Sequence, residues 1–302
     1  MAQQVVQSPV IFDRRLLHRR RERAMALGAA TFLLDRVAAD LAERLSTVLR
    51  KFERAADLGT PTDAVRQALA GRVPDLVAVV EQPASSATRA PRTVIADLEV
   101  LPLRESALDL AVSALSLQFV NDLPGTLVQI RRALKPDGLF LAALVGGASL
   151  SELREAFAAA EIEIEGGISP RVAPFVDVRD LGALLQRAGF ALPVTDVDRV
   201  IVRYPSPLAL FQDLRRMGAT NVLVERRRVP LRRATLRRMM EIYGARFSDP
   251  DGRVRATFEI VWLSGWAPHP SQQKPLQPGS AKARLADALR TREVSAGEKA
   301  GQ

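Results

Sequence analysis

Three acidic residues and one glycine follow short apolar runs in the first third of the chain. Asp57 and Gly59 close the first run, Glu81 follows the second and Asp97 follows the third. Carboxylates accept hydrogen bonds from hydroxyl and amino groups, and glycine lets a backbone approach a ligand closely. Ligands of open parallel sheets bind beyond the carboxyl ends of the strands. If the three runs are parallel strands, these residues lie together at one edge and form a candidate binding site.

The stretch 107–144 indicates the architecture that would position these side chains. It reads ALDLAVSALSLQFVNDLPGTLVQIRRALKPDGLFLAAL. A short apolar run precedes leucines and an isoleucine at helical spacing, and a Pro-Asp-Gly turn ends that helix before a second apolar run. A buried strand, a crossover helix and a second buried strand form one βαβ unit of a parallel sheet.

The rest of the chain is predicted to supply further strands and helices. Apolar residues at helical spacing predict a long N-terminal helix that ends near residue 50. Other strands are expected at 54–58, 76–80, 93–96, 194–203 and 256–266, with helices at about 63–70, 150–160 and 178–188. Residues 205–238 interrupt this pattern and are expected to form one or two helices with an arginine-rich link, well placed for a substrate lid.

We expect five parts in the chain, in which an α/β core is preceded by a helical extension and interrupted by a lid. They are residues 1–50 (N-terminal helical extension), 51–204 (core), 205–254 (helical lid), 255–267 (final core strand) and 268–302 (flexible tail).

Two arginine clusters, at 14–23 and 226–238, carry much of the net charge of +9. No aromatic residues alternate with them as a stacking platform for single-stranded nucleic acid requires. Solvated helix faces are therefore the favoured interpretation, followed by docking to an acidic protein partner, and nucleic acid is an unlikely partner.

Cysteine is absent, which excludes disulfides, thiolate nucleophiles and cysteine-based zinc sites. No apolar run reaches the roughly 18 residues that cross a bilayer, and the N-terminus lacks the apolar segment of a signal peptide. We expect no membrane span and a cytoplasmic bacterial protein.

The stretch 107–144 is characteristic of the second half of a class I S-adenosylmethionine (SAM) methyltransferase domain. The chain therefore resembles this class of proteins. The resemblance implies an α/β, Rossmann-like class I methyltransferase fold with a mostly parallel seven-stranded sheet. It also implies that Glu81 accepts the ribose hydroxyls of SAM, that Asp97 binds the adenine amino group, and that residues 113–119 face the transferred methyl. The implied cofactor-binding residues are Asp57, Gly59, Glu81, Asp97, Leu98, Ser113 and Ser116.

The loop after the first strand departs from the methyltransferase pattern of acid–Leu–Gly–x–Gly–x–Gly. The chain has DLGTPTD, so Gly59 is kept, but Pro61 and Asp63 replace the second and third glycines. Proline fixes φ and has no N–H to donate, and Asp63 would bring negative charge toward the carboxylate of SAM. Weakened, altered or lost SAM binding all remain open at this point.

Longer motifs narrow the resemblance to the mitochondrial complex I assembly factors of methyltransferase fold and their alphaproteobacterial relatives. More distantly, the chain resembles the malonyl-carrier-protein methyltransferases of biotin synthesis. The motifs are IFDR at 11–14, SLQFVNDLP at 116–124, LKPDG at 134–138, EGGISP at 165–170, DLGALL at 180–185 and DLRRMGATN at 213–221. Gln118-Phe119 stands where the relatives tend to have His-Trp.

The predicted function is SAM-dependent methyl transfer to an unidentified acceptor. One alternative is a non-catalytic assembly protein of the complex I type that has lost the cofactor loop, and a second is a protein arginine hydroxylase, as the resemblance suggests. The resemblance also suggests a protein substrate or a respiratory complex I subunit as partner.

No catalytic residue is assigned, because methyl transfer needs chiefly the alignment of nucleophile and methyl group. The candidate substrate contacts are Gln118, Phe119, Tyr204, Asp213 and Asn221. A non-haem iron site usually needs two histidines and a carboxylate. His18 and His269 lie at opposite ends of the chain and are interpreted as surface residues, so no metal site is predicted.

Overall fold

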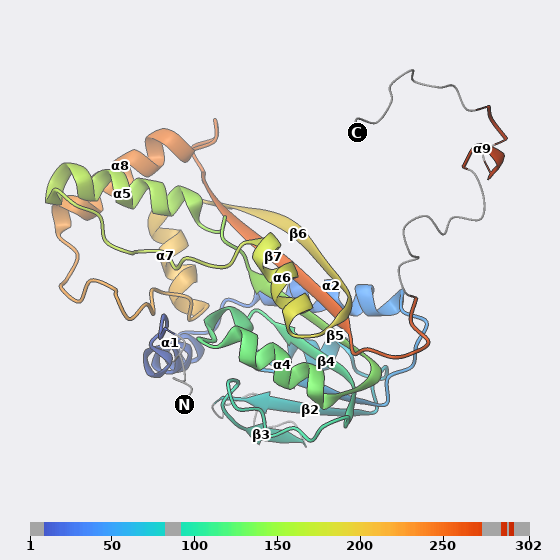
Figure 1. The fold of residues 1–302 in the computed structure, drawn as a ribbon. Coiled ribbons are helices and arrows are strands. Elements are labelled where there is room, and N and C mark those ends of the chain that lie inside the picture. The colour runs from blue at the N-terminus through green and yellow to red at the C-terminus, as the bar shows by residue number, and fades with distance from the viewer. Residues whose placement is uncertain (1–8, 82–91, 274–284, 289, 293–302) are drawn as a thin grey trace, which may run out of the picture. The chain divides into compact units, whose positions relative to one another are not determined.

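The computed structural model describes residues 9–81, 92–273, 285–288 and 290–292. It divides into two compact units, residues 1–268 and 269–302. The first unit contains every strand of the described residues (Figure 1), and the described part of the second contains the short helix α9 (Leu285–Ala288).

The first unit is built on a seven-stranded sheet with the order β3-β2-β1-β4-β5-β7-β6. Strands β1 to β5 run parallel to one another, whereas β7 pairs antiparallel with both β5 and β6. The strands are β1 (Arg54–Leu58), β2 (Asp75–Val80), β3 (Thr93–Ile95), β4 (Leu108–Ala114), β5 (Leu134–Val145), β6 (Ala191–Tyr204) and β7 (Val254–Trp266). The predicted mostly parallel seven-stranded α/β sheet is confirmed.

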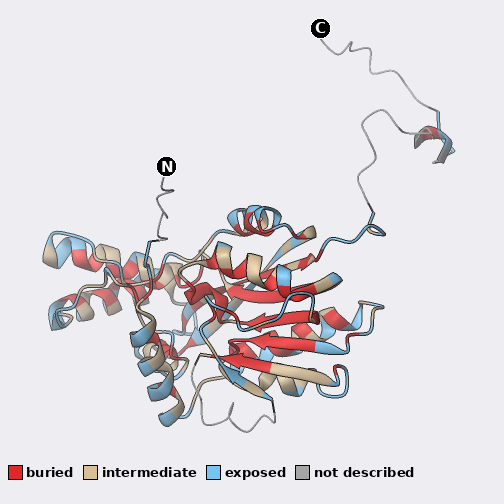
Figure 2. Cartoon of the chain, turned by 60° about the horizontal axis from the view of Figure 1, so that its bottom comes forward, coloured by how far each residue is buried: buried red, intermediate tan, exposed pale blue. Residues whose placement is uncertain are grey.

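Helices cover both faces of the sheet, so its central strands are buried on both sides (Figures 1 and 2). On β1, Ala55 faces the cluster of α2 (Phe32–Ser46) and α3 (Ala64–Ala68). The next residue, Ala56, faces the cluster of α4 (Leu123–Ala133) and α6 (Val178–Arg187). Because successive residues of a strand point to opposite faces, a fully buried strand is apolar at nearly every position.

The segment predicted as a lid contains α7 (Pro207–Arg216), a link over 217–232 and α8 (Arg233–Phe247). Helix α8 packs beside α5 (Ser151–Glu165), and Figure 1 shows α5, α7 and α8 gathered at one end of the sheet. The arginine-rich link is anchored to α5, because Arg227 pairs with Glu165, and Arg238 of α8 pairs with Glu163. These two arginines therefore pair with carboxylates of α5 rather than being only solvated.

The N-terminal extension forms two helices, α1 (Arg14–Ala26) and α2, rather than one long helix. The chain turns at Gly28, whose φ of +80° is unfavourable for residues with a side chain. Helix α1 lies against α7. In the turn between α1 and α2, the Ala30 N–H donates to the carbonyl of Arg216 at 3.1 Å. The predicted single helix is wrong at this point.

Candidate functional site

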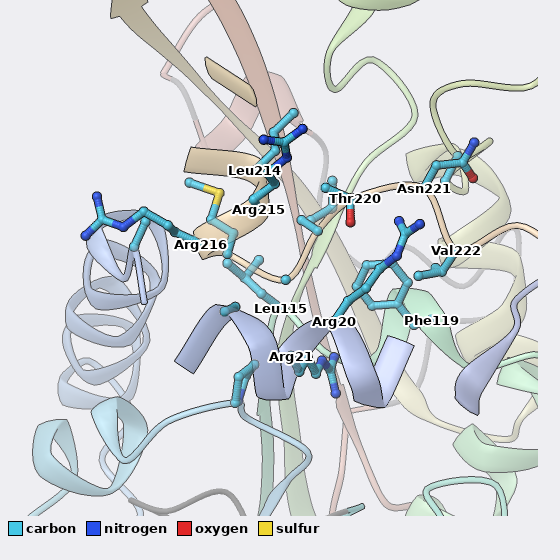
Figure 3. Close-up of a pocket in the computed structure, with 18 of the residues that line it drawn as sticks. Arg20, Arg21, Leu115, Phe119, Leu214, Arg215, Arg216, Thr220, Asn221 and Val222 are labelled. Carbon is cyan, nitrogen blue, oxygen red and sulfur yellow. The ribbon is translucent and has the colours of Figure 1, made fainter. Parts of the chain in front are cut away.

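A cavity of about 780 Å³ lies at the carboxyl ends of β1, β2, β4 and β5. Its floor includes the loop 59–62 and Glu81, and its walls include Gln118 and Phe119 after β4. Helix α1 and the predicted lid segment both line it, as Figure 3 shows for Arg20 and Arg21 of α1 and for Leu214, Thr220 and Val222 of the lid segment. The tertiary structure thus brings the loop, one strand-end acid and the lid to a single cavity.

Gly59 has a left-handed backbone and no room for a side chain. Its φ is +75°, and a Cβ built there would lie 2.5 Å from Cδ1 of Leu98 and 2.6 Å from Oγ of Ser116. Its N–H donates to the carbonyl of Val79 at 2.7 Å, which ties the loop to β2. Leu98 and Ser116, predicted as cofactor contacts, pack against Gly59 and are not among the residues that line the cavity.

The residues at the two substituted glycine positions, Pro61 and Asp63, face different surroundings. Pro61 lines the cavity, so that wall of the loop presents a proline ring and no N–H donor. Asp63 precedes α3, and its carboxylate accepts a hydrogen bond from Nε2 of Gln67 at 2.9 Å. Asp63 does not line the cavity, so its charge is turned toward α3 rather than toward a ligand.

Asp57 lies beneath the loop and is fully buried. Its Oδ1 accepts a hydrogen bond from the hydroxyl of Thr60, and its Oδ2 lies 3.6 Å from Nη1 of Arg66. Thr60 also accepts from the Ala114 N–H at 3.2 Å, and the Ser113 hydroxyl donates to the Leu58 carbonyl at 2.7 Å. Burial raises the pKa of Asp57 to about 6 although Thr60 and Arg66 oppose the rise. Asp57 and Ser113 therefore support the loop from below.

Glu81 is the strand-end acid that reaches the cavity, and three basic side chains of α1 contact it. Its Oε1 is paired with Arg14, and its Oε2 lies 3.3 Å from Nε2 of His18 and 3.5 Å from Nη1 of Arg21. Burial alone would raise the pKa of Glu81. The hydrogen bond from His18 and the charges of Arg14 and Arg21 outweigh burial and lower this pKa to about 2.

Asp97 is joined to Glu81 through the same arginine. Arg14 Nη2 lies 2.6 Å from Oδ1 of Asp97, and its Nη1 lies 3.0 Å from Oε1 of Glu99. Asp97 is 51% exposed and does not line the cavity. The two acids predicted to bind the nucleoside are therefore close to one another and are both held by α1.

Gln118 and Phe119, the residues after β4, form the wall next to α1. Gln118 donates from Nε2 to the Leu115 carbonyl at 2.9 Å, which leaves its buried Oε1 without a hydrogen-bond partner among the described residues. The Phe119 ring makes edge contacts with Phe12 at 5.6 Å and Phe175 at 6.1 Å between ring centres. This wall is an aromatic cluster with one free amide oxygen.

The three predicted substrate contacts of the lid region are placed differently. Asn221 lines the cavity, donates to the Pro170 carbonyl at 2.6 Å and accepts from the Leu223 N–H at 3.0 Å. Tyr204 and Asp213 do not line the cavity. Burial and the nearby carboxylate of Asp213 raise the pKa of the Tyr204 phenol, which packs beneath the lid.

The sequence reasoning missed the contribution of α1. His18 was expected at the surface, but its side chain is only 19% exposed and contacts Glu81, so that interpretation is wrong. Arg14, His18 and Arg21 are spaced i, i+4 and i+7, which places them on one helix face. That spacing was a usable signal, whereas Glu81, the acid they face, is 60 to 67 residues away in sequence.

Two negative observations concern the described residues alone. Within them, no group of three or more His, Cys, Asp or Glu side chains is arranged to hold a metal ion. In that same part of the chain, no helix combines the length and the apolar character needed to cross a membrane.

Comparisons with known proteins agree with this geometry. A family model described as a methyltransferase domain matches residues 56–142. The chain is 39% identical over 287 residues to arginine-hydroxylase NDUFAF5 of Danio rerio, covering 92% of this chain and 89% of that protein. The human protein of the same name is 40% identical, covering 90% of this chain and 81% of its own length.

Two further similarities extend the comparison. Malonyl-[acyl-carrier protein] O-methyltransferase of Halorhodospira halophila is 34% identical, covering 84% of this chain and 88% of that protein. The solved structure of a putative methyltransferase from Bacillus halodurans superposes with a TM-score of 0.54 at 16% identity, covering 76% of this chain and 99% of that structure. This last likeness concerns the fold alone.

Proposed function

This chain belongs to the family of SAM-dependent methyltransferase-like proteins that includes arginine-hydroxylase NDUFAF5 and malonyl-[acyl-carrier protein] O-methyltransferase, and on that premise we propose that it binds SAM in the cavity and transfers the methyl group to an acceptor. The supporting observation is that Gly59 and the buried carboxylate Glu81 line one cavity at the carboxyl ends of neighbouring parallel strands. Ligands of such sheets bind at this edge.

The residues of the site fit parts of the cofactor. Gly59 lines the cavity, and Glu81 is an acceptor at the strand end where ribose hydroxyls would be held. When bound, SAM supplies an electrophilic methyl group. The chain contributes binding and orientation, with the Phe119 wall excluding water and the free Oε1 of Gln118 available to a donor group.

Calorimetry with SAM and S-adenosylhomocysteine tests this proposal. The native protein is expected to bind both, and Glu81→Ala is expected to weaken binding about 10- to 100-fold, as the loss of hydrogen bonds to a charged group does. Asp75→Ala is the matched control, because Asp75 begins the strand that ends just before Glu81. No binding at millimolar ligand by folded native protein would exclude the methyltransferase function.

The alternative of a non-catalytic assembly protein concerns the same loop. Pro61 removes a backbone donor from the cavity wall, which favours this alternative. If the double variant Pro61→Gly with Asp63→Gly binds S-adenosylhomocysteine and the native chain does not, the site has lost the cofactor and the assembly function is favoured. Equal binding by the two proteins would count against it.

Arginine hydroxylation is a second candidate, favoured by identities of 39% and 40% to arginine-hydroxylase NDUFAF5 over about nine tenths of this chain. Mass spectrometry of respiratory complex I subunits from a strain that lacks this protein is the direct test. Loss of a hydroxylated arginine would support hydroxylation, and an unchanged set of modifications would exclude it.

A further inference from the structure

Arg20 is a cation of the cavity wall that has an unsatisfied side-chain nitrogen. It extends from α1 toward the lid link, where Thr220, Asn221 and Val222 lie (Figure 3). Its Nη1 is buried and has no hydrogen-bond partner among the described residues. A buried donor without a partner costs free energy, and the cost is larger for a charged group. Such a group therefore requires an explanation.

Two neighbouring arginines of the same cavity, Arg21 and Arg226, have carboxylate partners. Arg21 lies 3.5 Å from Glu81, and Arg226 lies 3.2 Å from Asp13. The negative charge of Asp13 acts on Arg20, but both carboxylate oxygens of Asp13 have other partners. Its Oδ1 accepts the Leu16 N–H, and its Oδ2 is paired with Arg226. No carboxylate of the described residues forms an ion pair with Arg20.

Burial and nearby positive charges further disfavour the unpaired charge of Arg20. Burial lowers the pKa of Arg20, and the positive charges of Arg226 and Arg23 lower it further. A guanidinium that is desolvated and surrounded by like charges binds an anion strongly when one enters, because the anion satisfies the free N–H and offsets the repulsion. The apolar rings of Phe119 and Phe175 line the same cavity.

We propose that Arg20 is an anion-binding residue of the cavity and takes a carboxylate group of the bound ligand. The planar guanidinium matches a carboxylate bidentately. The carboxylate has two possible sources, the amino-acid end of SAM and the acceptor molecule. The inference rests on the proposed function only if the carboxylate belongs to SAM. Pro61, which lines the same cavity, offers no N–H to an anion.

The experiment compares three probes on three proteins by calorimetry. The probes are S-adenosylhomocysteine, 5′-methylthioadenosine, which has the same nucleoside thioether without the amino-acid end, and succinate as a simple carboxylate. The proteins are the native chain, Arg20→Gln and Arg19→Gln. Arg19 is the control because it is exposed, lies on the same helix and does not line the cavity.

Each source of the carboxylate predicts a different result. If it belongs to the cofactor, Arg20→Gln weakens S-adenosylhomocysteine binding about 10- to 100-fold and leaves 5′-methylthioadenosine unchanged. If it belongs to the acceptor, both nucleosides bind as before and succinate binding is lost. Succinate binding that depends on Arg20 in a protein that binds neither nucleoside would support the anion site while excluding the methyltransferase function.

Equal binding of all three probes by native protein and Arg20→Gln would overturn the proposal, as would an equal loss in Arg19→Gln. Absence of binding of all three probes to folded native protein would overturn it as well. Arg20→Lys serves as the second variant if Arg20→Gln does not fold, because lysine keeps the charge and loses the bidentate fork. It is expected to weaken binding of the carboxylate probe and to leave 5′-methylthioadenosine unaffected.

Discussion

The buried carboxyl group of Asp57, which supports the loop 59–62 from below, should make the free energy of unfolding depend on pH. Its pKa is about 6 in the folded protein, above the ordinary value of 3.8, so the folded state retains a proton that the unfolded state releases between these pH values. The free energy of unfolding should therefore fall as the pH rises from about 4 to 6, by about 3 kcal/mol. Above pH 6 the buried charge continues to cost this amount.

We predict that Asp57→Asn removes this fall, because an amide does not titrate. The difference in the free energy of unfolding between variant and native protein, from urea titrations at pH 4 and pH 7.5, should shift in favour of the variant at the higher pH. Asp109→Asn should behave oppositely, because Lys135 and backbone donors hold the pKa of Asp109 below its usual value despite burial. A difference for Asp57→Asn that is independent of pH would contradict the assignment.

Gly59 combines a left-handed backbone with close contacts to other side chains. Comparing its substitution with that of a glycine that has the same backbone conformation and no such contacts separates the two effects on stability. Gly59→Ala places a Cβ 2.5 Å from Leu98 and 2.6 Å from Ser116, and we expect a loss of about 2–4 kcal/mol in the free energy of unfolding. Gly71→Ala is the control, because its φ of +78° imposes similar strain while no atom lies within 4 Å. It should cost about 1 kcal/mol. Equal losses would show that the contact at Gly59 is unimportant.

At the scale of elements, the segment before α1 is held by the side chain of Asn121. Its Oδ1 accepts the N–H groups of Ile11 and Phe12 at 2.8 and 2.7 Å, and its Nδ2 donates to the Phe12 carbonyl at 3.2 Å. Asp122 caps α4 by accepting the Gly125 N–H at 3.0 Å. The Asn-Asp-Leu-Pro motif thus positions both the helix after β4 and the start of α1.

Asn121→Ala should release the start of α1 while the sheet remains folded. We expect faster amide hydrogen exchange in α1 and unchanged exchange in β4 and β5, because local openings follow the contacts that are lost. Gln129→Ala is the control, since Gln129 also makes several hydrogen bonds near this loop but none to α1. Unchanged exchange in α1 would show that other contacts hold the segment.

At the scale of the whole molecule, Arg14 joins the N-terminal extension to the core. Its guanidinium pairs with Glu81, Asp97 and Glu99, and the adjacent segment pairs with the lid through the Asp13 N–H and the Val222 carbonyl at 2.8 Å. Extension, core and lid therefore meet at the cavity, and a ligand that uses Glu81 must share this carboxylate with α1.

We predict that Arg14→Gln lowers the free energy of unfolding by about 1–3 kcal/mol. The loss of one partner of a buried pair usually costs 3–5 kcal/mol, but Glu81 keeps His18 and Arg21. Chemical denaturation would measure the change, and Arg15→Gln, at an exposed neighbouring position, should cost less than about 0.5 kcal/mol. Similar losses for the two variants would contradict a core-anchoring role for Arg14.

The amino-acid sequence by itself determined the sheet and the strand-end positions of Asp57, Gly59, Glu81 and Asp97. Apolar runs and helical periodicity are local, and parallel strands place their carboxyl ends at one edge. Only the tertiary structure decided which of these side chains reach the cavity. Glu81 lines it, whereas Asp57 supports the loop from below.

The basic face of α1, formed by Arg14, His18 and Arg21, shows most clearly what the sequence alone leaves undecided. The sequence contains its i, i+4, i+7 spacing but not the partner, because the pairing of Arg14 with Glu81 spans 67 residues and depends on the turn at Gly28 and on the hold of Asn121. Local patterns report which face of an element is polar. Which opposite charge that face meets, and whether one cation such as Arg20 is left without a partner, is decided by packing between distant segments.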